Sequence, residues 1–347
     1  MRYKAKSTMG GNMQKNIRFL KKPHLVKPIL IVAWPGMGEV ALRSASYLVE
    51  KLKFEAFAVL SSADYFYPTA SSIKNGILKT KDLPQNHFYY WKNPNTKTDS
   101  RIKANDLIIF LGNTQPDLAK ATDYVNSILE VARFYKVKLI ISFAAMPAPI
   151  DHIQNPNVWF TATSKELFKY LEGYNLKMMS EGEISGMNGL FLGLANRAGF
   201  SGFCLLGEIP IYTIQIENPK TVFAILDRLK RILNLTLDLA DLNKQAHFIE
   251  GEINKLVDYL KEGIGLPALS GPGPISDAEM EKIKKSLTQL TRLPQSIKEK
   301  IEKLFELAIN DVSKANELKQ ELDKWNVYKE YEDRFLDLFK KPKDKGN

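Results

Sequence analysis

The feature that most constrains the fold is a series of short, mostly apolar segments separated by stretches of helical periodicity. The segments are residues 28–34 (PILIVAW), 106–111 (DLIIFL), 138–143 (KLIISF) and 203–206 (FCLL), and the first ends at a Pro-Gly pair. Strands that are apolar on both faces are typical of parallel sheets with helices on each side. The sequence therefore predicts an α/β fold with a mainly parallel sheet covered on two sides.

Helical patterns and weaker strand signals fill the intervals between these segments. We expect further strands at 54–60 and 158–161, and helices at about 39–51, 116–135, 165–171, 188–198, 221–233 and 237–261. Residues 73–79 and 87–92 predict a short strand pair inserted before the main pattern resumes. This pair makes the expected sheet mixed.

Composition divides the chain into four parts: a basic arm over residues 1–27, an α/β domain over 28–262, a Gly/Pro-rich linker over 263–276 and a helical tail over 277–340. We expect the tail to hold helices at about 277–290, 294–310 and 312–340. The last of these carries an apolar stripe at alternating three- and four-residue steps, which is typical either of ordinary helix packing or of a partner-binding surface.

The net charge of +10 is concentrated at the start of the chain. The arm holds eight basic and no acidic residues, which leaves +2 for the other 320 residues. A basic cleft is therefore not implied, and nucleic acid is an unlikely partner unless the arm itself binds it. No apolar run is long enough to span a bilayer, so no membrane association is expected. A single cysteine, Cys204, excludes an intrachain disulfide and fits the cytoplasm.

Three segments resemble the proteasome assembly chaperone 2 family. Residues 34–41 (WPGMGEVA) match its Pro-Gly-x-Gly turn after the first strand. Residues 186–195 (GMNGLFLGLA) look like its Gly-x-Asn-Gly-Leu-Leu-Leu-Gly-Leu-Ala helix, and residues 204–210 (CLLGEIP) resemble its strand ending in Leu-Gly-Glu-x-Pro. The resemblance implies a three-layer α/β/α sandwich akin to nucleoside phosphorylases, self-association, and a role in binding other proteins rather than in catalysis.

One departure limits what the resemblance implies about proteasomes. Archaeal relatives that engage proteasomes can end in a hydrophobic-Tyr-any motif that docks between proteasome subunits. This chain ends Lys345-Gly346-Asn347. The docking mode that depends on this motif is therefore not expected here.

The first candidate site is the turn that contains Gly36, Gly38 and Glu39. A strand, a Gly-rich turn and a helix N-terminus can present backbone N–H groups to a phosphate. The Lys-Ser/Thr of a P-loop is missing, however, and the Glu39 carboxylate competes with an anion at the helix start unless Arg43 or a metal neutralises it. The alternative is a structural tight turn that needs small residues.

The residues do not favour phosphorylase chemistry. Met187 stands where that superfamily has the Met of a Met-Glu pair, but Asn188 follows it, and Gly207 lies where several members carry an Arg. Glu183 and Glu208, with Glu181, Glu39 and Asp64, predict an acidic pocket at the carboxyl edge of the sheet as one hypothesis. The alternative is that these acids cap helices and bond loops.

The remaining chemistry is sparse. The four histidines lack metal-ligand spacing, and Cys204 lies in an apolar strand, where a thiol is usually inert. We therefore expect no catalytic residues, no metal and no cofactor. The leading interpretation is a non-catalytic, self-associating interaction or assembly-chaperone-like protein. The alternative is a small-molecule or nucleotide-binding, hydrolase-like enzyme that uses the Gly turn and the Glu cluster.

Overall fold

The computed structural model describes residues 16–68, 71–80, 82–94, 105–261, 295–311, 314–324 and 328–339. Within these ranges the chain divides into two compact units, residues 1–246 and 247–347. The predicted linker at 263–276 and the first tail helix at 277–290 lie outside the described residues. No helix in the ranges given above is long and apolar enough to cross a membrane.

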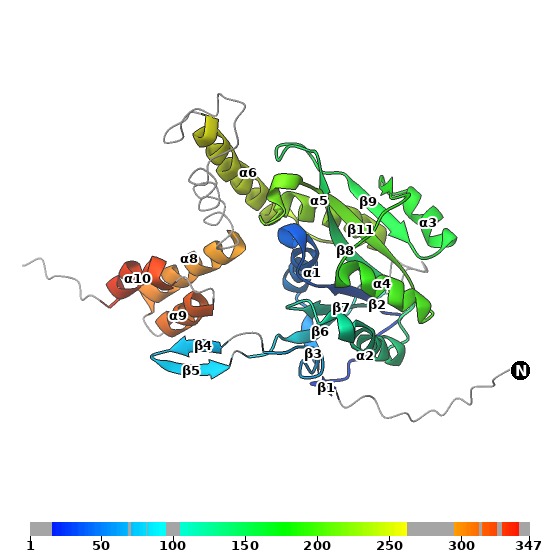
Figure 1. Ribbon diagram of the computed structural model, residues 1–347, viewed down its shortest axis with the longest axis horizontal. Helices are drawn as coiled ribbons and strands as arrows, with labels where there is room; N and C mark the ends of the chain where they lie inside the picture. Colours follow the sequence, from blue (N-terminus) through cyan, green and yellow to red (C-terminus); the bar gives the residue numbers. More distant parts are fainter. Residues whose placement is uncertain are drawn as a thin grey trace, which may run out of the picture. The chain divides into compact units, whose positions relative to one another are not determined.

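A nine-stranded mixed sheet forms the centre of the first unit, with the strand order β1-β3-β6-β7-β2-β8-β11-β9-β10 (Figure 1). The strands are β1 (Ile17–Phe19), β2 (Ile29–Ala33), β3 (Glu55–Leu60), β6 (Asn86–Trp91), β7 (Leu107–Gly112), β8 (Leu139–Ala148), β9 (Val158–Ala162), β10 (Lys177–Met178) and β11 (Ser201–Pro210). The central four, β7, β2, β8 and β11, are mutually parallel, as their continuous apolar sequences predict. Antiparallel strands flank them on both sides.

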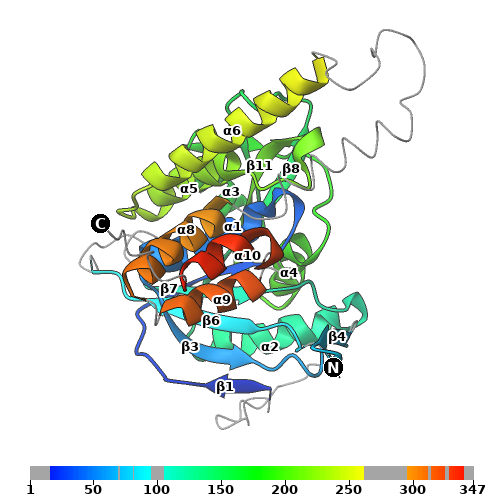
Figure 2. The ribbon, with the colours of Figure 1, turned by 90° about the vertical axis from the view of Figure 1, so that its left-hand side faces the viewer.

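Helices cover both faces of this sheet and complete a three-layer sandwich (Figure 2). One face packs against α1 (Val40–Lys51) and α5 (Pro219–Leu233), and the other against α2 (Ala121–Phe134) and α4 (Met187–Arg197). The remaining helices of this unit are α3 (Lys165–Glu172) and the beginning of α6 (Ala240–Lys261), with the short 3-10 turns η1 (Met37–Glu39), η2 (Leu118–Lys120) and η3 (Ile211–Thr213).

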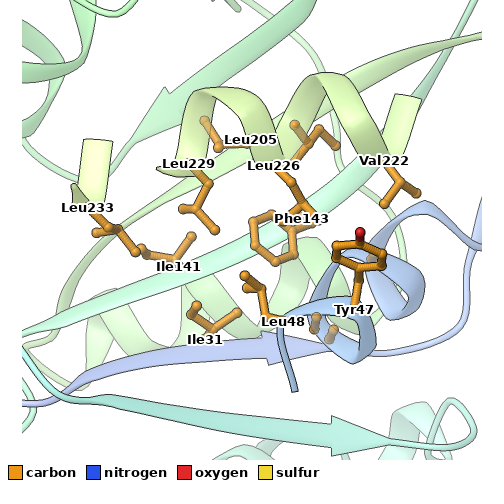
Figure 3. Close-up of a cluster of buried hydrophobic side chains, with 14 of the residues drawn as sticks. Ile31, Tyr47, Leu48, Ile141, Phe143, Leu205, Val222, Leu226, Leu229 and Leu233 are labelled. Carbon is orange, nitrogen blue, oxygen red and sulfur yellow. The ribbon is translucent and has the colours of Figure 1, made fainter. Parts of the chain in front are cut away.

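Alternation along β2 assigns its side chains to two separate cores. Ile31 points into the first core, where it meets Leu48 of α1 and Leu229 of α5 (Figure 3). Val32 and Trp34 belong to the second core, beneath α2 and α4. Because successive strand residues face opposite sides, a strand that is apolar at every position is stable only when both faces are covered.

The prediction that residues 73–79 and 87–92 form a strand pair is wrong. Residues 71–80 form a separate two-stranded hairpin, β4 (Ser71–Lys74) with β5 (Ile77–Thr80), whereas β6 joins the main sheet between β3 and β7. The turn of the hairpin is Asn75-Gly76, in which both residues have positive φ. Asn-Gly closes a two-residue hairpin by itself, so residues 71–80 need no pairing with β6.

Two further differences concern the ends of the chain. β1 lies inside the predicted basic arm and pairs antiparallel with β3 at the edge of the sheet, and Lys21 forms an ion pair with Glu55 beside it. In the second unit α8 (Gln295–Asn310) agrees with the predicted helix. The single helix expected over 312–340 is instead two, α9 (Ala315–Lys324) and α10 (Tyr328–Asp337), which share a core around Phe305.

Candidate functional site

The Gly turn after β2 is bonded to a second loop of the same unit. Gly38 donates its N–H to the Ile214 carbonyl (2.7 Å) and accepts from the Asn218 N–H (3.1 Å), and Glu39 donates to the Gly36 carbonyl (3.0 Å). Gly38 and Glu39 both have left-handed backbone conformations, and a Cβ added at Gly38 would lie 2.7 Å from Asn218 Nδ2. Because Gly38 and Glu39 already donate to protein carbonyls, the turn has the bonding of a structural junction rather than of a phosphate cradle.

Two amide side chains hold the end of β2. Asn188, at the start of α4, accepts from the Trp34 N–H and donates to the Trp34 carbonyl, each at 3.0 Å. Gln115 donates to the Pro35 carbonyl (2.6 Å) and accepts from the Met187 N–H (2.9 Å). Together they couple β2, α4 and the loop after β7, and Gln115 satisfies one of the N–H groups that a helix start leaves without an intrahelical partner.

A cavity of about 400 Å³ opens at the carboxyl ends of β2, β8 and β11, where open α/β sheets bind ligands. Of the predicted site residues, Gly36, Glu183 and Asn188 line it, whereas Gly38, Glu39 and Glu208 do not. The rest of the wall is mostly apolar, and includes Met37, Ala144, Ala145, Met146, Pro147, Met179, Ile184 and Leu206. Glu183 is exposed, so the cavity has one carboxylate at its rim.

Glu208 is instead buried within β11, where it fastens the antiparallel strand β9. Its carboxylate accepts from the Asn157 N–H (2.9 Å), from Asn157 Nδ2 (2.7 Å) and from Trp159 Nε1 (2.8 Å). Burial acts to raise the pKa of Glu208, but these hydrogen bonds and the nearby Lys177 outweigh it, so the pKa is lowered. The ionised carboxylate is thus a structural clamp between two strands.

Glu39 has the opposite electrostatic environment. Burial and the neighbouring carboxylate of Glu217 raise the pKa of Glu39, and Arg43 only partly offsets them. Arg43 forms an ion pair with Glu217 and lies 3.5 Å from Gln245 of α6. The carboxylates of Glu39 and Glu217 therefore lie near one guanidinium on the α1 face of the sheet. The sequence analysis predicted that Arg43 could neutralise Glu39 but did not identify Glu217.

A second cavity, of about 510 Å³, lies beyond β3 and β7 and was not predicted from the sequence. Its walls combine aromatic, leucine and proline side chains with three polar ones and two carboxylates: Tyr65, Phe66, Tyr67, Pro68, Leu83, Pro84, Pro116, Asn113, Thr114, Gln115, Asp82 and Asp117. Residues 65–68 and 82–84 of this wall precede and follow the β4–β5 hairpin, and residues 113–117 follow β7. The sequence signal was the run Tyr65-Phe66-Tyr67-Pro68, which is unusually aromatic for a loop.

The remaining candidates do not form a reactive group. Cys204 is fully buried, and burial raises the pKa of its thiol to about 12. Within the described ranges no three His, Cys, Asp or Glu side chains gather as a metal site would require. Glu181 and Asp64 are exposed. The acidic pocket hypothesis is therefore reduced to Glu183 at the first cavity.

Residues 30–257 match the PAC2 family, and the chain belongs to it. Its relatives include the uncharacterized protein MJ1210 of Methanocaldococcus jannaschii, which is 27% identical over 241 residues, 69% of this chain and 86% of that protein.

Solved structures show the same fold. The crystal structure of PbaB from Pyrococcus furiosus, an archaeal proteasome activator, is 27% identical, covers 70% of this chain and 98% of its own, and has a TM-score of 0.58. PbaA from the same organism, an archaeal homolog of proteasome-assembly chaperone, is 24% identical, with a TM-score of 0.54 over 72% of this chain and 94% of its own.

Proposed function

We propose that this protein is a non-catalytic, assembly-chaperone-like protein that associates with itself and binds other proteins in the cytoplasm. The observation that carries the proposal is the bonding state of the polar groups at the carboxyl edge of the sheet. The side chains of Asn188, Gln115 and Glu208 form hydrogen bonds with other residues of this chain. Membership of the PAC2 family and the likeness to PbaB support the same role.

We propose proteasome subunits as the partner class, because PbaB, to which this chain is similar, is an archaeal proteasome activator. The test mixes the purified full chain with proteasome α subunits of the organism that encodes it and follows complexes by native gel electrophoresis and light scattering. The expected result is a stoichiometric complex or faster assembly of the α ring. The proposal of a proteasome partner fails if the α subunits assemble at the same rate and no complex forms.

A second candidate function rests on the 400 Å³ cavity, which is large enough for a small organic molecule. Its largely apolar wall and the exposed Glu183 fit an apolar ligand with one amine. Thermal-shift measurements with nucleosides and aromatic amines test this, using Ala145→Leu to fill the cavity and the exposed Ala63→Leu as the matched control. A shift that Ala145→Leu abolishes and Ala63→Leu retains favours a ligand site; the absence of any shift favours the interaction protein.

A further inference from the structure

The aromatic walls of the 510 Å³ cavity are fixed by packing and hydrogen bonds. Tyr65 and Phe66 are buried, and both rings pack edge-to-face on Tyr124, with centroids 5.1 and 5.9 Å from that of Tyr124. The Tyr65 hydroxyl is bonded to Ser127 Oγ and accepts from Asn16 Nδ2, each at 2.7 Å. Side chains that are already held lose little conformational freedom when a ligand binds, so the cavity is preformed.

The chain segments that carry these walls are also bonded to one another. The Asp117 N–H donates to the Tyr65 carbonyl (3.2 Å), which joins the loop after β7 to the loop after β3. The Asn113 N–H donates to the Gln85 carbonyl (3.1 Å), which joins the loop after β7 to the residues before β6. Three segments far apart in the sequence therefore form one cavity with a defined shape.

The charged side chains of this cavity are acidic. Asp82 and Asp117 line it from two different segments, and the described residues of its wall include no Lys, Arg or His. Both aspartates are exposed, so a cation can reach either carboxylate from solvent. The faces of aromatic rings attract cations as well. The cavity therefore favours a cation and disfavours an anion.

The apolar part of the wall decides which kind of cation fits. Phe66, Leu83, Pro84 and Pro116 bring carbon surface to the same cavity as the carboxylates. A metal ion gains nothing from such a surface. An alkyl chain with ammonium groups uses both parts, because its methylene groups leave water at the apolar wall and its N–H groups meet the carboxylates. A volume of about 510 Å³ is ample for such a molecule.

We propose that this cavity binds an aliphatic polyamine, with ammonium groups at Asp82 and Asp117 and the alkyl chain against the aromatic and proline wall. The site is distinct from the 400 Å³ cavity. The two linings share one residue, Gln115, whose amide is bonded to the Pro35 carbonyl and the Met187 N–H. Polyamine binding goes beyond the function proposed above and depends neither on self-association nor on a protein partner.

The first test titrates the full chain with hexamethylenediamine, a diamine with one ammonium group for each carboxylate, by isothermal titration calorimetry. Asp82→Asn with Asp117→Asn removes both charges and keeps both shapes, and Asn at position 117 can still accept the N–H of Ala119, which Asp117 now accepts at 2.9 Å. We expect one site per chain in the wild type and affinity weaker by about tenfold in the double variant, because two charge-assisted contacts are lost.

The matched control is Glu50→Gln with Glu172→Gln. Both glutamates are exposed and lie outside the lining of the cavity, so this variant changes the net charge by the same amount. Its affinity for the diamine is expected to stay within about twofold of the wild type. Circular dichroism melts of both variants are expected to match the wild type, since all four substituted side chains are exposed.

The second test uses the wild type alone and varies the ligand at constant charge. Affinity is expected to rise from ethylenediamine through putrescine to hexamethylenediamine, by about twofold for each added methylene group that the wall partly buries. Mg²⁺, which has the same charge and no apolar surface, is expected to bind more weakly than hexamethylenediamine.

Four results would overturn the site: no binding of the diamine, unchanged affinity in the Asp82 and Asp117 double variant, an equal loss in the Glu50 and Glu172 control, or binding of Mg²⁺ as tight as that of hexamethylenediamine. The last two would reduce the effect to a general attraction of cations to the protein. Each measurement uses the chain without a partner. Failure of the polyamine site therefore leaves the proposed protein-binding role standing, and failure of that role leaves the polyamine site standing.

Discussion

Glu208 and Glu39 lie near the ends of two central parallel strands, and burial acts to raise the pKa of both, but their hydrogen bonds and neighbouring charges differ. Three N–H groups from Asn157 and Trp159 stabilise the charge of Glu208. Glu39 has a strained backbone, a partly buried side chain and a second carboxylate nearby. The pKa is thus lowered for Glu208 and raised for Glu39, although both lie near the same edge of the sheet. The presence of acidic residues in the sequence is therefore not enough to predict an acidic pocket.

The largest effect is expected from removing the better-bonded acid. Glu208→Ala leaves three partly buried donors without their acceptor and is expected to lower the free energy of unfolding by about 2–4 kcal/mol at pH 7. Urea denaturation measures it. Glu208→Gln keeps the shape and is expected to cost about half as much. A loss below about 1 kcal/mol for Glu208→Ala would contradict the clamp.

Asn188→Ala removes both bonds to the backbone of Trp34 and leaves two buried main-chain groups unsatisfied. The expected loss is about 2–3 kcal/mol in the same denaturation experiment. The matched control is Asn196→Ala, at an exposed position near the other end of α4, which is expected to change stability by less than about 0.5 kcal/mol. Equal changes of stability in the two variants would show that the bonds from Asn188 to Trp34 do not stabilise the fold.

Gly38→Ala tests whether the turn is a structural junction. Its φ of +59° and the 2.7 Å approach of an added Cβ to Asn218 predict a loss of about 1–2 kcal/mol. Gly193→Ala is the control, because an added Cβ there meets nothing within 4 Å, and it is expected to be neutral or stabilising. If Gly38→Ala proves as mild as Gly193→Ala, the turn tolerates side chains and its glycine has another role.

Glu39→Gln is expected to have the smallest effect and the opposite sign. The folded-state pKa of Glu39 is raised, so its contribution to stability is fully present below the unfolded pKa and is lost as pH rises through the folded pKa. Gln does not titrate. The variant is therefore expected to be slightly more stable than the wild type at pH 7, and equally stable near pH 4. Thermal melts at the two pH values decide it.

Much of the sheet was predictable because β2, β7, β8 and β11 are apolar at nearly every position, a pattern that only a doubly covered strand requires. The pairing of β6 was not, since a short alternating strand fits either a local hairpin or the main sheet. The hydrogen bonds of Gln115 and Asn188 could not be predicted from the sequence for another reason. Gln115 and Asn188 bond to residues 72 to 154 positions away, and no local pattern encodes such partners.

Because β1 has only three residues, its pairing with β3 is expected to open more often than the pairing of β3 with β6. A short edge strand opens without unfolding the protein, whereas the β3–β6 pairing opens only with the sheet. Hydrogen exchange is therefore expected to divide β3 into two classes of amide, fast where they face β1 and slow where they face β6. Each opening of β1 would expose the edge of β3, with its unpaired backbone N–H and C=O groups, to other strands until β1 pairs again.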